Sequence, residues 1–148
     1  LDITVYPSTY SYRLFGFPKE IEVKGRLQNG IDLGEEILFH YDGFDVSISA
    51  AIDNLKGLEK AKIKGSKGSL FLPFYHSSCI FFLRKKFIFK MFFKRKQNSY
   101  LFEFEKVKEE IQSRKLESDF VRQDSTSAVM KILDEIRRKM SLVYSELE

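Results

Sequence analysis

The spacing of apolar residues changes along the chain, and each spacing predicts a different element. In residues 2–15 large apolar residues recur every three or four positions, which predicts a first helix. These residues are Ile3, Tyr6, Tyr10 and Leu14. Gly16 and Pro18 mark its end. Because proline fits the first turn of a helix but not its interior, we expect the helix proper to begin near Pro7, with residues 2–6 as a turn leading into it.

Between residues 18 and 73 the period becomes two, with apolar residues alternating with polar ones. This pattern predicts strands at residues 21–24, 37–41, 46–50, 59–64 and 69–72. The turns between them are predicted at Asn29-Gly30, at Asp42-Gly43 and at residues 65–68. Residues 80–83 and 87–93, rich in phenylalanine, predict two further strands around a turn at 84–86. We therefore expect an antiparallel meander with one apolar and one polar face.

Helical spacing returns after residue 100. Residues 101–113 place apolar side chains on one side of a helix: Leu101, Phe104, Val107 and Ile111. The acidic residues of this helix are expected to be largely solvated: Glu103, Glu105, Glu109 and Glu110. Residues 125–144 have the clearest periodicity of the chain: Val129, Ile132, Leu133, Ile136, Met140 and Val143. Asp124 or Ser125 is the expected N-cap. The order helix, strands, two helices predicts a single α+β domain over residues 1–148.

Composition places the chain among globular proteins. Its 148 residues are 43% apolar and 31% charged, enough for one domain with its own core. The single cysteine, Cys79, excludes an internal disulfide framework and fits a reducing compartment, so we expect a cytoplasmic protein. No apolar run is long enough to span a membrane, and no signal peptide is visible. The chain begins without Met inside a structured motif, so we expect it to be part of a longer protein.

The net charge of +4 is concentrated in one region. Residues 74–99 contain seven Lys or Arg residues and no acid. Within them, the basic aromatic stretch 80–96 combines cations with phenylalanine rings, as nucleic-acid and anionic-membrane binding sites do. The alternative is a pair of strands with rings facing the core and lysines facing water. We favour the strands, and expect neither a nucleic acid nor a membrane as a partner.

Motifs that carry common chemistry are missing. The sequence contains no glycine-rich dinucleotide or phosphate loop, because its close pair Gly65 and Gly68 lies between two predicted strands and indicates a hairpin turn. His40, His76 and Cys79 are too few and too scattered for a metal site, so we expect no metal. We expect His40 to pack on its strand, and Cys79 to be a small core residue.

Asp2 and Tyr6 are the candidate chemical residues. If the first segment is helical, side chains four positions apart lie on one face, so the aspartate can orient the phenol and tune its proton affinity. Such a pair is half of a proton-transfer site.

Several segments in order resemble the Gfo/Idh/MocA oxidoreductases, the family named for glucose–fructose oxidoreductase and inositol dehydrogenase. Residues 1–7 (LDITVYP) resemble the family's D-I-G-V-Y-P signature, most closely that of the dihydrodiol dehydrogenase branch. Residues 12–21 resemble the helix end and first strand of the family's C-terminal domain, and residues 61–70 (AKIKGSKGSL) resemble its I-x-G-T-K-G-x-I hairpin. Residues 102–118, ending in RKLES, and 125–144 are similar to its last two helices. Only residues 74–99 fit poorly.

The resemblance implies the second domain of a two-domain NAD(P)-dependent dehydrogenase, acting on a sugar, polyol or dihydrodiol hydroxyl or the matching carbonyl. NAD or NADP would be bound mainly by an N-terminal Rossmann domain absent from this chain.

In the family, a lysine of a Glu-Lys-Pro motif in that domain works with the Tyr or His of a D-x-x-x-[Y/H] segment. Carried over, Tyr6 is the general acid/base, and Asp2 orients it or binds substrate. A tyrosine titrates near pH 10, and a nearby lysine cation lowers that pKa. Thr4 stands where the family has glycine. This chain alone is expected to be inactive.

The fold expected from these lines together is α+β: an open, mainly antiparallel sheet with helices on one face. In the family the other face of the sheet packs against a second subunit, which implies a homodimer. Ile48, Phe71 and Phe89 are candidates for that contact. A non-catalytic binding or assembly domain that uses the basic aromatic stretch 80–96 is the alternative function.

Overall fold

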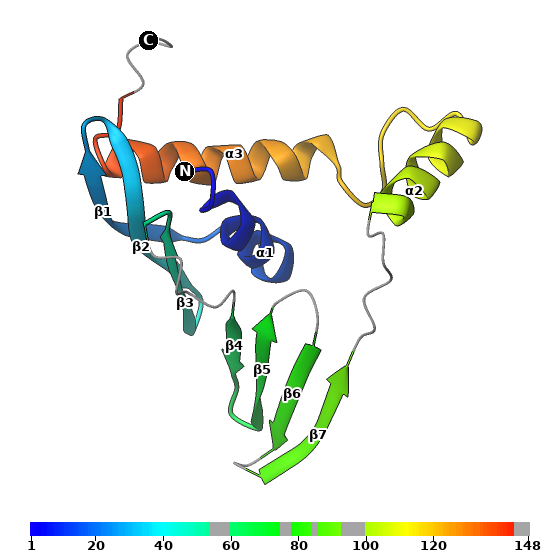
Figure 1. Ribbon diagram of the computed structural model, residues 1–148, viewed down its shortest axis with the longest axis horizontal. Helices are drawn as coiled ribbons and strands as arrows, with labels where there is room; N and C mark the ends of the chain where they lie inside the picture. The colour runs from blue at the N-terminus through cyan, green and yellow to red at the C-terminus, as the bar shows by residue number, and fades with distance from the viewer. Residues whose placement is uncertain (54–59, 75–77, 84–85, 93–99, 144–148) are drawn as a thin grey trace. The chain divides into compact units, whose positions relative to one another are not determined.

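The computed structural model describes residues 1–53, 60–74, 78–83, 86–92 and 100–143, and the side chains of residues 73–99 lie outside what it describes. It contains helices and antiparallel sheets, which confirms the α+β class (Figure 1). The chain divides into two compact units, Leu1–Leu55 with Leu116–Glu148, and Lys56–Lys115. The predicted strands divide between two sheets, β1-β2-β3 in the first unit and β4-β5-β6-β7 in the second.

The sheet of the first unit is an antiparallel meander of β1 (Glu20–Gln28), β2 (Ile31–Tyr41) and β3 (Phe44–Ala51). Asn29 and Gly30 connect β1 to β2 with positive φ angles of 52° and 77°. Two successive positive φ angles are typical of the type I′ hairpin turn, which matches the twist of the strands. The predicted hairpin turn at Asn29-Gly30 is therefore confirmed, and the pairing Tyr41↔Phe44 confirms the one at Asp42-Gly43.

The core of the first unit lies between this sheet and the helix α3 (Gln123–Lys139). On the sheet side it consists of Ile21, Ile37, Phe39 and Ile48. From α3 it receives Val129, Ile132, Leu133 and Ile136, as the helical period predicted. Ile48 is only 5% exposed, so its assignment to a contact with a second subunit is wrong. The pairing Ile37↔Ile48 puts both residues on the face of the sheet that the helices cover.

Both ends of α3 differ from the prediction. Arg122, rather than Asp124 or Ser125, is the N-cap, and it makes no side-chain cap hydrogen bond. The helix ends at Lys139 because Ser141 has a φ of 54°, and the N–H of Leu142 donates to the carbonyl of Arg137. This arrangement is a Schellman motif, in which the chain reverses and the following apolar residue packs back. Leu142 is therefore buried at 3% exposure, whereas Val143 is exposed.

The first helix, α1 (Val5–Phe15), lies beside α3 (Figure 1). Of the residues whose spacing predicted the helix, Ile3, Tyr6 and Leu14 are exposed. The buried residues are instead small and polar: Thr4, Ser8 and Ser11. Two of these three hydroxyls bond to side chains of β2, which offsets the cost of burying them. Pro7 falls in the first turn, as expected.

The second unit contains the four-stranded antiparallel sheet and the helix α2 (Tyr100–Gln112). The hairpin between β4 (Ala61–Lys64) and β5 (Gly68–Phe74) is confirmed, with the Gly65 N–H donating to the Gly68 carbonyl at 2.8 Å. Glu110 of α2 is 8% exposed, so its predicted solvation is wrong. The apolar residues that were predicted to share one side of α2 are exposed along its length: Leu101, Phe104, Val107 and Ile111.

Most of the basic aromatic stretch forms β6 (Ser78–Leu83) and β7 (Lys86–Phe92), which pair antiparallel. The backbone thus confirms two strands. The directions of their lysine and phenylalanine side chains lie outside the described residues, as do the positions of His76 and residues 93–96. Phe71 on β5 is half-buried, while the side chain of Phe89 is likewise outside the description.

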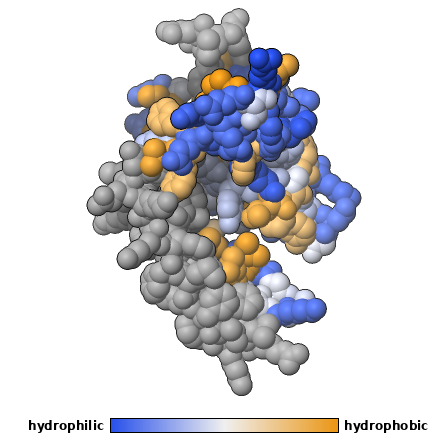
Figure 2. Space-filling model, turned by 90° about the vertical axis from the view of Figure 1, so that its right-hand side faces the viewer, coloured by the Kyte–Doolittle hydropathy of each residue, from blue (hydrophilic) through white to orange (hydrophobic). Residues whose placement is uncertain are grey.

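Large apolar side chains also reach the protein surface. On the face drawn in Figure 2, orange apolar areas interrupt the blue polar ones. In the first unit the exposed apolar residues include Ile3, Tyr6, Leu14, Phe17 and Ile52. Several of them belong to α1 or lie next to it, so the solvent-facing side of this helix is less polar than its buried side.

Candidate active site

Asp2 and Tyr6 are both exposed at the start of α1. Asp2 is in the turn that precedes the helix, and Tyr6 is the second residue of the helix. The backbone between them is already helical, because Thr4 has φ −66° and ψ −24° and accepts a 3.2 Å bond from the N–H of Ser8. Residues four apart in such a turn share one face. Both side chains are exposed, Tyr6 by 60%, so they are open to a ligand or to another domain.

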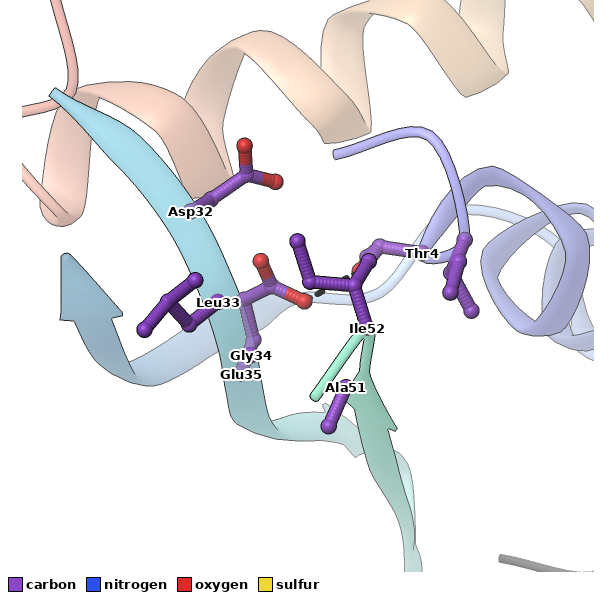
Figure 3. Close-up of a pocket in the computed structure, with 8 residues that line it drawn as sticks. Thr4, Asp32, Leu33, Gly34, Glu35, Ala51 and Ile52 are labelled. Atoms are coloured by element: carbon purple, nitrogen blue, oxygen red, sulfur yellow. Dashed lines mark hydrogen bonds between the residues drawn. The ribbon is translucent and has the colours of Figure 1, made fainter. Parts of the chain in front are cut away.

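Thr4, between these two residues, faces the opposite way. A step of about 100° per residue puts its side chain about 160° away from those of Asp2 and Tyr6. It is 0% exposed, and its hydroxyl donates a 2.5 Å hydrogen bond to the Glu35 carboxylate (Figure 3). Thr4 therefore points into the protein, away from the exposed side of the turn.

Glu35 is a buried carboxylate that sequence patterning did not identify as special. It is 4% exposed and lies on β2 facing α1, with Asp32 three residues earlier on the same strand (Figure 3). Burial raises the pKa of the Glu35 carboxyl above its ordinary value; the hydrogen bond from Thr4 acts against this, and the charge of Asp32 adds to it. A signal was present in the sequence: Glu35 occupies the same alternating row as Ile37 and Phe39, the apolar row of β2.

A small hollow lies beside this hydrogen bond. Its walls include Ile3, Thr4 and Asp32 (Figure 3). The free volume is about 10 Å³, which is room for about one water molecule. The hollow is thus too small for an organic substrate.

The far end of α1 is also held by β2. The hydroxyl of Tyr41 donates to the carbonyl of Gly16 at 3.1 Å, and lies 3.2 Å from the hydroxyl of Ser11. Since the Tyr41 proton goes to Gly16, Ser11 is the donor in the second bond. The ring of Tyr41 stacks on Phe44 with 4.9 Å between centroids. Both ends of α1 therefore bond to side chains on the same face of one strand.

His40 lies on the other face of the sheet, partly exposed, and is bonded rather than simply packed. Its Nδ1 is 2.8 Å from an Asp45 oxygen and its Nε2 is 3.2 Å from a Glu22 oxygen. These two hydrogen bonds raise the pKa of His40 above its ordinary value. Among the described residues no group of three or more His, Cys, Asp or Glu side chains could hold a metal ion. Nor is any described helix both long and apolar enough to cross a membrane.

Comparison of the chain with protein-family models found no match, and comparison with curated proteins found none at a significant level. The assignment proposed below therefore depends on the residues and geometry described above.

Replacing Glu35 by Gln should change how stability depends on pH. The folded-state pKa lies above the ordinary value of 4.5, so the folded protein holds the Glu35 proton more tightly than the unfolded chain does. This contribution to stability is complete below about pH 4.5 and is lost as the pH rises through the raised pKa. Glu35→Gln keeps an oxygen for Thr4 and has no charge to bury. In urea unfolding between about pH 4 and 7, the variant should gain stability relative to the native chain as the pH rises.

The control is Glu36→Gln, at the exposed neighbouring position on the opposite face of β2. Parallel pH curves for the native chain and Glu35→Gln would contradict the raised pKa.

Proposed function

We propose that this chain is the substrate-binding and dimerisation domain of a cytoplasmic NAD(P)-dependent oxidoreductase of the Gfo/Idh/MocA type. The reaction would interconvert a hydroxyl and a carbonyl on a sugar, polyol or dihydrodiol. The observation that carries the proposal is that Asp2 and Tyr6, four residues apart at the start of α1, are both exposed. The ordered resemblance of the sequence over most of its length supports it.

Tyr6 is the proposed general acid and base. A phenol open to solvent can donate its proton to a carbonyl oxygen, or accept one from a hydroxyl once a neighbouring cation has lowered its pKa. Asp2 would accept a hydrogen bond from a substrate hydroxyl on the same face. Neither side chain makes a hydrogen bond or ion pair with the described residues, so both are available for a ligand. A lysine from a preceding domain would complete the site.

The cofactor does not fit within this chain. A dinucleotide binds at the carboxyl ends of parallel strands next to a glycine-rich turn, whereas the described strands pair antiparallel and the sequence has no such turn. When bound, the nicotinamide would supply the hydride chemistry. What these residues contribute is the substrate's orientation and the proton at the Tyr6 oxygen.

A homodimer through a face of a sheet is part of the same proposal. Ile48 takes no part in it, because it lies in the core, while Phe71 stays a candidate. Sedimentation at micromolar concentrations should give twice the 17.4 kDa chain mass, and a monomer mass throughout would contradict the dimer.

In a full-length protein, Tyr6→Phe should lower turnover by about 10²–10⁴-fold, the usual contribution of a general acid or base, with little change in cofactor affinity. The measurement is steady-state oxidation of candidate polyols and dihydrodiols with NAD or NADP. Tyr10→Phe, one turn further along α1, is the matched control and should retain activity. The 148-residue chain alone should neither bind NAD(P) tightly nor turn over.

Two results would contradict the proposal. One is a coding sequence with neither G-x-G-x-x-G nor Glu-Lys-Pro upstream of Leu1. The other is unchanged turnover of Tyr6→Phe, which would favour the binding-domain alternative built on the stretch 80–96.

A further inference from the structure

The buried face of α1 offers little to fix the rotation of the helix about its axis. Thr4, Ser8 and Ser11 form one line along the helix at 0%, 0% and 3% exposure. Their side chains are short, and dispersion contacts between short side chains have no preferred direction. Val5 and Tyr12 add only partly buried apolar contacts at the edge of the core. Directional hydrogen bonds must therefore set the rotation.

At the start of α1 two directional contacts reach β2: the bond from Thr4 to Glu35, at 2.5 Å, and the ion pair of the Leu1 amino group with Asp32. Of the two, the bond from Thr4 is the one made by a side chain on the buried face of α1. The N-cap supplies no other side-chain hydrogen bond. Glu35 itself is held on the central strand of its sheet, between Gly25 on β1 and Ala50 on β3. A central strand moves less than a helix end, so Glu35 is the fixed partner and Thr4 the positioned one.

We propose that Glu35 is a positioning residue for Tyr6. Its hydrogen bond with Thr4 fixes the first turn of α1 and thereby the direction of the Tyr6 side chain. This inference rests on the proposed function, in which Tyr6 is the acid and base. Side-chain atoms lie about 5–6 Å from a helix axis, so a rotation of about 10° moves them by about 1 Å. A displacement of about 1 Å can lower a rate by about 100-fold. Fixing the turn is therefore sufficient to control the rate.

Ser8 provides an internal comparison. It lies one turn after Thr4 on the same buried face, is equally buried, and its hydroxyl has no hydrogen-bond partner among the described residues. Removing this hydroxyl takes away a buried polar group of the same kind without breaking a bond. Ser8→Ala thus separates the loss of a hydroxyl from the loss of the contact with Glu35.

The test uses four variants and two readouts. Thr4→Val keeps the shape of the side chain but cannot donate; Thr4→Ser keeps the donor; Glu35→Gln keeps an acceptor; Ser8→Ala is the control. In the full-length protein, Thr4→Val should lower kcat by about 10- to 100-fold with KM changed less than about 3-fold. The other three variants should stay within about 3-fold of the native kcat. All rates are measured at a temperature well below unfolding, where a merely stabilising contact leaves kcat unchanged.

The second readout is NMR of the 148-residue chain, which needs no activity. Thr4→Val should shift or broaden the ring signals of Tyr6 and speed amide exchange in the first turn of α1, while Ser8→Ala should leave the Tyr6 signals in place. Unchanged Tyr6 signals and kcat in Thr4→Val would overturn the positioning role and leave the proposed function standing. If Tyr6→Phe is fully active, the proposed function fails. The positioning of a catalytic phenol by Glu35 then fails as well, even where Thr4→Val shifts the NMR signals of Tyr6.

Discussion

The hydrogen bond from Thr4 to Glu35 is the constraint on which, by the role proposed for Glu35, the orientation of the first turn of α1 depends. A carboxylate in the helix-covered face of a sheet is costly unless it is bonded, and a buried threonine hydroxyl is costly for the same reason. The hydrogen bond between them, with 2.5 Å between the two oxygens, offsets the cost of burying each group. Because neither can move away without leaving a buried polar group unpaired, the first turn of α1 is held in one orientation. Asp2 and Tyr6 then face solvent by the geometry of a helical turn.

One row of side chains on β2 both holds α1 and contributes to the hydrophobic core. Its middle residues, Ile37 and Phe39, are 2% and 0% exposed and pack against α3. Its two ends, Glu35 and Tyr41, bond to the two ends of α1. A single strand therefore sets both the position of the core and the orientation of the helix that carries the candidate site.

Strong local periodicity made most elements predictable. The turn at Asn29-Gly30 and the apolar stripe of α3 are each specified by residues within one short segment, and both are confirmed. The division of the strands into two sheets could not be predicted, because a period of two identifies strands but not which strands pair.

The site was predicted only in part, for physical reasons. The four-residue spacing of Asp2 and Tyr6 made them candidates, and in the structure both are exposed at the start of α1. The buried face of α1 was not predicted, because Thr4, Ser8 and Ser11 are small and polar, whereas the spacing that predicted the helix is that of large apolar residues. Glu35 was missed because a glutamate side chain is ordinarily expected to be exposed to solvent. Only its place in the same alternating row as Ile37 and Phe39 indicates that it is buried. Where Ile48 faces depends on register, which is set by pairing with β2.

The most direct measurement of the central claim is a double-mutant cycle between Thr4→Val and Glu35→Leu, read by urea unfolding at neutral pH. The account predicts a coupling energy of about 1–3 kcal/mol, the contribution of a hydrogen bond to a charged partner. The pair Ser8→Ala and Glu35→Leu should be additive. A coupling energy below about 0.5 kcal/mol between Thr4 and Glu35 would contradict the claim that this bond holds the start of α1.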